Sequence, residues 1–371
     1  MKRARTTILY HPREITLFYS MWPLLRSPYW HRFDYTTELD RCLNHDPNQR
    51  ILIVGFFLYE MRRRGEDYVV ETMARIRKKY GFVAFWDDND GSGIDYAAVL
   101  PYVDVYYKKQ ILKDRTAYTR PLWGTRPYGV TLFGDYYVRN QLGTAAAGIE
   151  EIIQVKNPAD LEKLKLVWNL SWGSYPLIDN RVQKVGTPVF TATHPWLSRF
   201  VHRTPRKFPY ARDRSGKRSA CSFRYSRGKF DPAIGFQREY MTKILTDAGF
   251  EGFERVTREQ FYLEMAECVA SFSPFGWGEV CFRDFESLLA GCVVIKPDCG
   301  HFETYPDMYR AGETYASVRW DGSDLVAVVR QVLDSPALRK QLCEGAEHAY
   351  WEAWNGMEEW VSAFAESVLG Q

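Results

Sequence analysis

The chain has 371 residues, of which 46% are hydrophobic, 26% are charged and 16% are aromatic. These are globular proportions that exclude a disordered, collagenous or coiled-coil protein, and the length predicts about two domains. The net charge of +3 is too small to indicate nucleic-acid binding.

The N-terminus and the cysteines bear on the compartment. The charged start is not followed by the apolar segment of a secretory signal, and no run of about 18 apolar residues predicts a membrane span. Seven cysteines without framework or CxxC spacing favour reduced thiols over disulfides or a structural zinc. We therefore expect a cytoplasmic protein. Peripheral association with the inner face of the membrane is the alternative, because residues 15–33 mix aromatic and basic side chains, although Pro23 and Pro28 favour a packed segment.

The first half of the chain alternates apolar runs with helical periodicity. In chain order we predict a strand at 51–57, a helix at 67–80, a strand at 82–86, a helix at 96–103, a strand at 104–107 and a helix near 148–165. This alternation predicts an α/β domain with a parallel sheet.

A second α/β series follows the basic segment 203–218, which we interpret as a linker or surface loop, with contact to an anionic lipid or polyanionic acceptor as the alternative. Its predicted elements are a strand at 220–225, helices at 233–248 and 258–268, a strand at 269–274, a helix at 283–290, a strand at 292–296, a helix at 324–333 and a helical tail from 338.

Polar side chains follow three predicted strands of the second series. Arg224, Arg227 and Lys229 follow the first strand, residues 275–286 follow the second, and His301 follows the third. Open α/β sheets bind ligands at the carboxyl ends of their strands, so these residues should share one rim. Cations, glycines and a helix start are the groups that bind a nucleotide diphosphate.

The segment 275–286 is the most specific of the three. Gly276 and Gly278 precede a predicted helix, on which Arg283 and Glu286 are three residues apart and share a face. Glu279 lies close to two turns before Glu286 and can face the same way. The alternative is a surface helix with an internal ion pair.

Residues 275–298, FGWGEVCFRDFESLLAGCVVIKPD, resemble the nucleotide-sugar signature of GT-B glycosyltransferases of the group-1, exostosin-like and bacterial polysaccharide types. The shared pattern is a small-residue turn, R-x-x-E, an apolar half-helix, a glycine and an apolar strand. The resemblance implies that Glu286 binds donor hydroxyls and that Arg283 lies at the phosphates or supports Glu286. Six residues separate Glu279 from Glu286, where retaining group-1 enzymes often have seven, so the role of Glu279 and the stereochemistry stay open.

The resemblance also implies an architecture and a donor. It predicts two Rossmann-like domains facing a cleft, an acceptor domain at 1–212 and a nucleotide-sugar domain at 213–348, with a tail helix at 349–371 that packs back on the first domain. Arg224, Arg227 and Lys229 match the cations that hold the donor pyrophosphate. Such enzymes use cationic side chains in place of a metal, so we expect no cofactor besides the nucleotide-diphosphate sugar.

Carboxylates crowd after the predicted strand at 82–86. Asp87, Asp88 and Asp90 are candidates for the general base that deprotonates an acceptor hydroxyl. A divalent-metal site and a turn with capping aspartates are the alternatives.

Three cationic residues are candidate acceptor contacts, namely Lys108, Lys109 and His194, with solvated or structural loop positions as the alternative. The expected function is transfer of a sugar from a nucleotide-activated donor to a hydroxyl of a glycan or glycolipid, in surface polysaccharide or glycoconjugate biosynthesis. An epimerase acting on a nucleotide sugar and a catalytically silent binding protein remain the other hypotheses. The sequence leaves the oligomeric state open.

Overall fold

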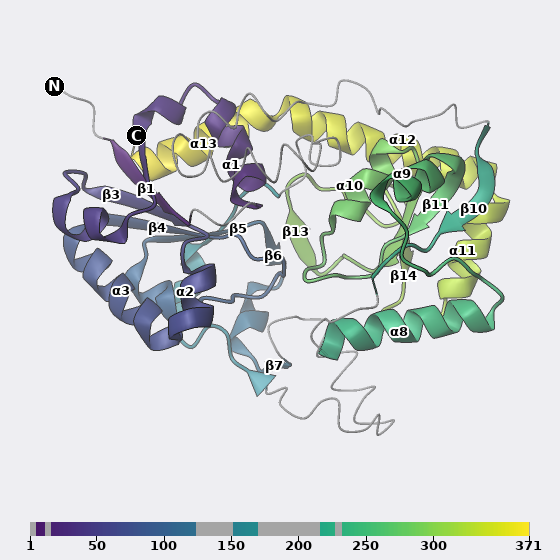
Figure 1. Cartoon of the computed structure of the whole chain (residues 1–371), viewed down its shortest axis with the longest axis horizontal. Helices are drawn as coiled ribbons and strands as arrows, with labels where there is room; N and C mark the ends of the chain where they lie inside the picture. The colour runs from purple at the N-terminus through teal and green to yellow at the C-terminus, as the bar shows by residue number, and fades with distance from the viewer. Residues whose placement is uncertain (1–4, 12–15, 124–150, 170–215, 227–231, 371) are drawn as a thin grey trace.

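Two α/β domains lie side by side, and the last helices of the chain run along both (Figure 1). The structure is a computed structural model that describes residues 5–11, 16–123, 151–169, 216–226 and 232–370. Each domain contains a sheet of parallel strands. The predicted fold class, two α/β domains with a helical C-terminal tail, is confirmed.

The first domain is built on a six-stranded sheet with the order β2-β1-β3-β4-β5-β9. Its strands are β1 (Thr6–Tyr10), β2 (Phe33–Thr36), β3 (Arg50–Val54), β4 (Phe82–Asp87), β5 (Val105–Lys108) and β9 (Leu164–Leu166). Its helical segments are α1 (Thr16–Arg26), η1 (Trp30–Arg32), η2 (Arg41–His45), α2 (Phe57–Arg64), α3 (Glu66–Lys79), η3 (Ala97–Tyr102), η4 (Arg115–Thr119) and η7 (Pro158–Lys163). β7 (Leu122–Trp123) and β8 (Glu151–Ile152) form a separate antiparallel pair.

The central strands follow from the sequence pattern. Residues 51–54 of β3 are all fully buried, as expected of a parallel strand covered on both faces. The predicted helix at 96–103 is instead the 3-10 segment η3, because Pro101 inside it lacks the backbone N–H that an α-helix needs. The predicted helix near 148–165 is wrong for its described part. Asn157 caps a 3-10 turn there, and the chain then extends to pair with β5 as β9.

The second domain has a four-stranded sheet with the order β10-β11-β12-β14. Its strands are β10 (Arg218–Ser222), β11 (Cys268–Phe272), β12 (Val293–Pro297) and β14 (Ala316–Val318). Its helices are α8 (Pro232–Asp247), α9 (Arg258–Glu267), α10 (Phe282–Leu289), α11 (Leu325–Asp334) and α12 (Pro336–Asn355). All five helices overlap the predicted ones, and a reciprocal capping box between Thr257 and Gln260 starts α9.

Two strands outside the main sheets join the domains. β6 (Gln110–Leu112) follows the first sheet, β13 (Phe302–Thr304) follows β12, and the two pair antiparallel in the middle of the molecule (Figure 1). The side chain of Arg115 forms an ion pair with Glu303 across the same boundary. The carboxyl ends of the two sheets are therefore held at a fixed distance from each other.

The final helix, α13 (Met357–Leu369), lies against the first domain (Figure 1). Its Phe364 packs among Trp86, Tyr107 and Trp168, with ring centroids 4.8 to 5.4 Å apart. This returning helix starts at Met357, eight residues after the expected 349, because the preceding turns of α12 still pack in the core of the second domain.

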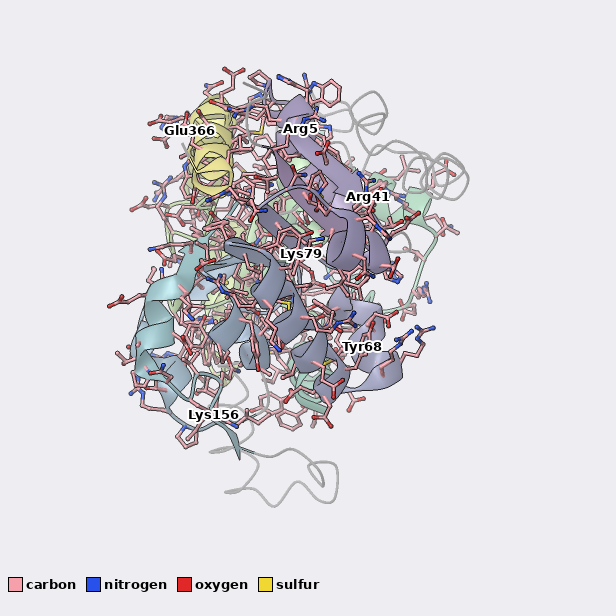
Figure 2. All side chains as sticks on the ribbon, turned by 90° about the vertical axis from the view of Figure 1, so that its left-hand side faces the viewer. Arg5, Arg41, Tyr68, Lys79, Lys156 and Glu366 are labelled. Atoms are coloured by element: carbon pink, nitrogen blue, oxygen red, sulfur yellow. The ribbon has the colours of Figure 1, made fainter. Side chains whose placement is uncertain are left out.

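Charged side chains project from the outer end of the first domain, among them Arg5, Arg41, Lys79 and Glu366 (Figure 2). Among the described residues, none of the helices combines the length and the apolar character that crossing a membrane requires. Several buried polar groups, Ser92, Gln110 and Glu279 among them, contact one another across the two domains, and the functional residues are sought there.

Candidate functional site

Two loops from different domains meet at the carboxyl ends of the sheets. The donor loop, residues 274–281, connects β11 to α10, and the acidic loop, residues 87–93, follows β4. A Cβ placed on Gly278 of the donor loop would overlap with the backbone carbonyl of Asp90 in the acidic loop. Glycine is required at this position because only a residue without a side chain lets the two backbones approach so closely.

Substitution of Gly278 by alanine should push the loops apart. We expect Gly278→Ala to lower the free energy of unfolding by about 1–3 kcal/mol, the usual cost of overpacking. The matched control is Gly235→Ala in α8, where a new Cβ has no atom within 4 Å and the helix gains stability by about 0.5–1 kcal/mol. Urea unfolding of both variants measures the difference. Equal effects at the two positions would contradict the close approach.

Glu279 spans the boundary between the loops. Its carboxylate is fully buried and accepts hydrogen bonds from the Ser92 hydroxyl at 2.6 Å and the Ser92 amide at 2.9 Å. Gln110 Nε2 lies 3.4 Å from one carboxylate oxygen, and His301 Nε2 lies 3.5 Å from the other. Burial alone would raise the pKa of Glu279, but His301 and Ser92 outweigh it and lower the pKa to about 2. The expected donor contact is revised: Glu279 faces the first domain.

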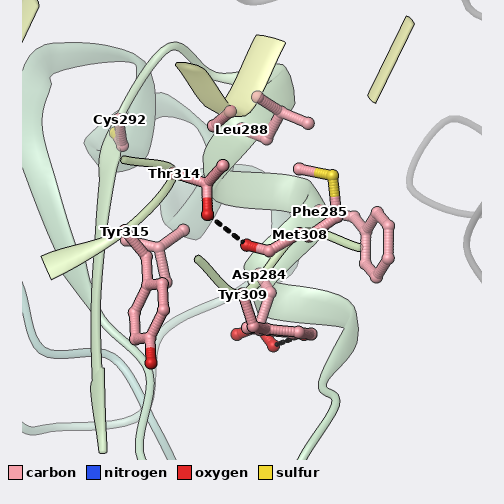
Figure 3. A pocket seen from close by; sticks show the side chains of 10 residues that line it. Asp284, Phe285, Leu288, Cys292, Met308, Tyr309, Thr314 and Tyr315 are labelled. Atoms are coloured by element: carbon pink, nitrogen blue, oxygen red, sulfur yellow. Dashed lines mark hydrogen bonds between the residues drawn. The ribbon is translucent and has the colours of Figure 1, made fainter. Parts of the chain in front are cut away.

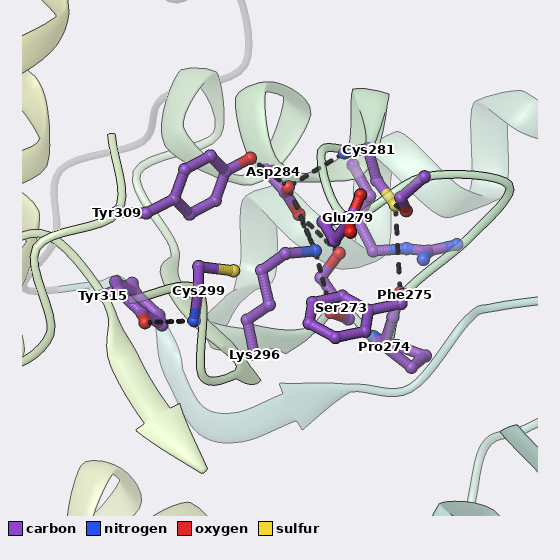
Figure 4. Close-up of polar contacts among 12 residues, drawn as sticks. Ser273, Pro274, Phe275, Glu279, Cys281, Asp284, Lys296, Cys299, Tyr309 and Tyr315 are labelled. Carbon is purple, nitrogen blue, oxygen red and sulfur yellow. Dashed lines mark hydrogen bonds and ion pairs between the residues drawn. The ribbon is translucent and has the colours of Figure 1, made fainter. Parts of the chain in front are cut away.

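A buried network fixes the start of α10. Asp284 accepts hydrogen bonds from the Ser273 hydroxyl and the Tyr309 hydroxyl, both at 2.5 Å, and from the backbone amide of Cys281 at 3.0 Å. Lys296 on β12 forms an ion pair with Asp284 at 3.2 Å (Figure 4). Sequence reasoning missed this network. The only local signal was the capping spacing of Asp284, three residues after Cys281.

Arg283 and Glu286 lie on α10 as the resemblance implies. One terminal nitrogen of Arg283 donates to the carbonyl of Arg224 at 2.8 Å, while its buried Nε has no hydrogen-bond partner among the described residues. Glu286 accepts a hydrogen bond from the Tyr262 hydroxyl at 2.8 Å. Burial raises the pKa of Glu286, although Tyr262 and the charge of Arg283 act against it. The helix thus presents a cation with an unused donor next to a carboxylate.

A cavity lies next to α10, but neither Arg283 nor Glu286 lines it. Figure 3 shows it between α10 and the loop that carries Met308 and Thr314, whose backbone carbonyl and hydroxyl are hydrogen-bonded at 2.7 Å. Its walls are mostly apolar, with Phe285, Leu288 and Tyr315 among them. We therefore place the candidate donor site on the side of α10 that carries Arg283 and Glu286.

The structure describes only one of the three cations expected to hold the pyrophosphate. Arg224 is engaged by two carboxylates, Glu264 at 2.7 Å and Glu254 at 3.0 Å, so the expectation that it neutralises phosphate is revised. Arg227 and Lys229 lie outside the described residues.

Arg238 on α8 was missed by sequence reasoning. It is buried beside the donor loop, where it donates to the carbonyls of Phe275 at 2.8 Å and Ser226 at 2.6 Å. Its position inside the predicted helix at 233–248, outside every motif, gave no signal. The side chain places a positive charge at the turn formed by Gly276 and fixes the backbone of that turn.

The three aspartates of the acidic loop occupy different environments. Asp87 is fully buried, ion-paired with Lys108 at 2.9 Å and hydrogen-bonded by the Tyr106 hydroxyl at 2.7 Å. Neither Asp87 nor Lys108 can contact an acceptor, because both side chains are 0% exposed. In this structure the pair links the ends of β4 and β5, and the predicted roles of Asp87 in catalysis and Lys108 in acceptor binding find no support in its geometry.

Asp88 and Asp90 share Lys109, whose ammonium group lies 3.4 Å and 3.2 Å from their carboxylates. Asp88 also accepts a hydrogen bond from Ser20 at 2.5 Å. Burial raises the pKa of Asp88, and the charge of Lys109 lowers it only in part. Lys109 is itself buried, so it orients these carboxylates and its expected contact with an acceptor is revised.

Asp88 borders a small pocket at the carboxyl ends of β3 and β4. Four of its eight lining residues are aromatic, and the lining consists of Gly55, Phe57, Leu58, Phe85, Trp86, Asp88, Asn89 and Tyr96. The cavity measures only about 10 Å³, and Phe57, Phe85 and Trp86 are at most 1% exposed, so it does not hold a sugar ring in this structure. Asp88 lies at its edge as a carboxylate with a raised pKa, which can accept a proton from a hydroxyl brought to the acidic loop. His194, the third expected acceptor contact, lies outside the described residues.

His301 is brought to the donor loop as expected from its place after β12. Its ring lies in a cage of aromatic side chains, 4.9 Å from Trp320 and 6.4 Å from Phe275 between centroids. Neither ring nitrogen has a hydrogen-bond partner within bonding geometry among the described residues. The described residues also contain no group of three or more histidine, cysteine or carboxylate side chains arranged to hold a metal ion.

Comparisons with known proteins identify similar folds. No protein-family model and no curated protein sequence matches the chain. A UDP-forming α,α-trehalose-phosphate synthase from Burkholderia vietnamiensis is 9% identical over 98% of this chain and 99% of that one, with a TM-score of 0.47. The DNA-modifying enzyme β-glucosyltransferase is 9% identical over 99% and 100% of the two chains, with a TM-score of 0.44. A UDP-N-acetylglucosamine 2-epimerase is 11% identical over 95% of both, with a TM-score of 0.34. At this level the likeness is one of general fold, and the roles of residues rest on the contacts of this chain.

Proposed function

We propose that this chain is a glycosyltransferase that binds a nucleotide-diphosphate sugar at the donor loop and α10 and transfers the sugar to a hydroxyl held beside the acidic loop. The observation that carries the proposal is the contact between the two loops at Gly278 and Asp90. It joins a glycine turn at a helix start, typical of phosphate binding, to a set of carboxylates suited to proton transfer. A transferase needs both halves within reach of one another.

The donor half is supported by the charges around α10. The start of the helix, Arg283 and Arg238 together favour the negative charge that develops on a leaving diphosphate. Glu286 is placed to accept hydrogen bonds from donor hydroxyls, and its bond from Tyr262 orients it. Because these arginines would balance the negative charge of the leaving diphosphate, the proposed reaction needs no metal.

The acceptor half is supported by Asp88, whose carboxylate has a raised pKa and lies in the loop that contacts the donor loop. In its ionised form this carboxylate can take the proton of the attacking hydroxyl. We extend the proposal to a glycan or lipid-linked acceptor, used in surface polysaccharide or glycoconjugate synthesis on the cytoplasmic side of the membrane. This extension rests on the resemblance of residues 275–298.

Nucleotide binding tests the donor half first. We expect one of UDP, GDP, CMP, ADP and dTDP to raise the melting temperature clearly above the others, because a ligand at about 100 times its Kd adds roughly 2.7 kcal/mol of stability. The shift should persist in EDTA, since Arg and Lys side chains rather than a metal are proposed to hold the phosphates. The Arg283→Ala variant should lose the shift, and Arg218→Ala, which removes an exposed cation paired with Glu267, should keep it.

The outcomes distinguish the hypotheses. No shift with any nucleotide or with the corresponding nucleotide sugars would contradict the proposed donor site. A shift that disappears in EDTA would contradict the metal-independent site. If the stabilising nucleotide sugar is converted to its epimer without any acceptor, the chain is an epimerase and the acceptor half of the proposal is wrong.

A further inference from the structure

The acceptor capacity of the Glu279 side chain is largely used within the protein. An ionised carboxylate offers about four lone-pair positions. The hydroxyl and the amide of Ser92 each occupy one, at 2.6 and 2.9 Å. Gln110 and His301 approach the two oxygens at 3.4 and 3.5 Å. A donor hydroxyl would have to displace one of these groups from a side chain that is 0% exposed.

Ser92 is in turn fixed from its other side. Its carbonyl accepts a hydrogen bond from the Tyr118 hydroxyl at 2.6 Å, and that hydroxyl accepts one from the amide of Leu112 in β6 at 2.9 Å. The acidic loop is therefore anchored to the first domain through Tyr118 and to the second domain through Glu279. The candidate base Asp88 lies four residues before Ser92 in the same loop.

We propose that Glu279 is a positioning residue, an interdomain clasp that holds the acidic loop against the donor loop through Ser92, and not a ligand of the donor. The proposal rests on the proposed function in one respect, that the loop held in place carries the catalytic base. It gives Glu279 a role other than donor contact, for which its place close to two turns before Glu286 had made it a candidate. The clasp aligns the acceptor hydroxyl with the donor carbon, while nucleotide binding depends on Arg283 and Glu286.

The charge state of the clasp suits this role. With its pKa lowered to about 2, Glu279 remains ionised throughout the working pH range, so both donors of Ser92 keep their acceptor. The titratable group that faces it is His301, from the loop after β12, with Nε2 3.5 Å from one carboxylate oxygen. On the neighbouring segments Lys109 is paired with Asp90, and Lys296 is paired with Asp284. Neutralising Glu279 without changing its shape removes this interaction selectively.

Glu279→Gln is the direct test, because the amide retains one oxygen acceptor but presents an NH₂ group to one of the two Ser92 donors. Hydrogen exchange of peptides covering 88–94 should become at least about tenfold faster in the free protein, because the Ser92 amide loses its acceptor. The Kd of the stabilising nucleotide should stay within about twofold, whereas kcat for transfer should fall about 10- to 100-fold, since a displacement of about 1 Å at the reacting groups has effects of this size. A residue that only stabilised the fold would not separate kcat from nucleotide affinity in this way.

Glu303→Gln is the matched control, because Glu303 also pairs across the domain boundary, but its partner Arg115 belongs to neither loop. It should leave exchange at 88–94 and kcat unchanged. Ser92→Ala keeps the amide and removes the hydroxyl, so it should reproduce the exchange and kcat effects in weaker form and add nothing further to Glu279→Gln. This variant decides the question if Glu279→Gln does not fold.

Unchanged exchange at 88–94 in the variants would overturn the clasp. A nucleotide Kd weakened more than about tenfold by Glu279→Gln would also overturn it, in favour of donor contact. If no transfer is found with any donor, the proposed function fails, but the exchange result and the matched control still decide whether Glu279 joins the two loops.

Discussion

Arg283→Ala is expected to lower kcat/KM for sugar transfer by about 100- to 1,000-fold. The value of kcat, measured at saturating donor, should fall as well. The guanidinium group lies at the start of α10, bound to the carbonyl of Arg224 and with its buried Nε unused among the described residues. A leaving diphosphate gains negative charge in the transition state, and removal of one preorganised donor costs about 2.7–4 kcal/mol in comparable sites. Steady-state kinetics with the stabilising nucleotide sugar measure the loss.

Two further variants sharpen this prediction. Arg283→Lys should recover activity only in part. The planar guanidinium group has several donors and can bind a phosphate and the Arg224 carbonyl together, whereas the compact ammonium group of lysine cannot reproduce this geometry. Arg218→Ala removes an exposed cation of the same domain and should have wild-type kinetics. Full activity of folded Arg283→Ala would show that the donor phosphates bind elsewhere and would remove the main support for the assignment of α10.

Asp88→Asn is expected to lower kcat by about 100- to 10,000-fold, the range found when a general base is removed. Asn keeps the shape of the side chain and an acceptor for Ser20, and it removes the proton-accepting charge together with the ion pair to Lys109. Asp88 borders the aromatic pocket, whereas Asp87 is neutralised by Lys108 in the core. Transfer rates to a sugar acceptor, compared with donor hydrolysis by water, measure the effect.

The pH dependence provides an independent check of Asp88. Burial raises its pKa above that of an ordinary aspartate, with Lys109 and Ser20 opposing in part. The base acts only when ionised, so kcat should fall as the pH drops through this raised pKa, and the acidic limb should lie at higher pH than for an exposed aspartate. Asp88→Asn should lose this limb, while Asp114→Asn, which alters an exposed carboxylate in the same domain, should keep both limb and rate. If Asp88→Asn retains the wild-type rate, Asp90 becomes the candidate base.

The central strands and the donor segment were predictable because their signals are local. The apolar runs of β3, β4 and β12 identify buried parallel strands. The glycines followed by R-x-x-E identify α10 and the face that carries Arg283 and Glu286. Sequence reasoning failed at η3, where Pro101 lies inside a weakly periodic segment, and at η7, where a short 3-10 segment leads directly into β9.

The partners of the charged residues were not predictable in the same way. Asp87, Asp88 and Asp90 are near neighbours in the sequence, yet their environments differ. Asp87 is buried in an ion pair with Lys108, Asp88 borders a pocket, and Asp90 is half exposed. Likewise, nothing near Glu279 indicates Ser92, which is 187 residues away in the chain. The sequence by itself determined where strands, helices and the phosphate-type turn occur, because these depend on neighbouring residues. Only the tertiary structure decided which charges are neutralised and which remain for chemistry, because burial and pairing depend on contacts between distant segments.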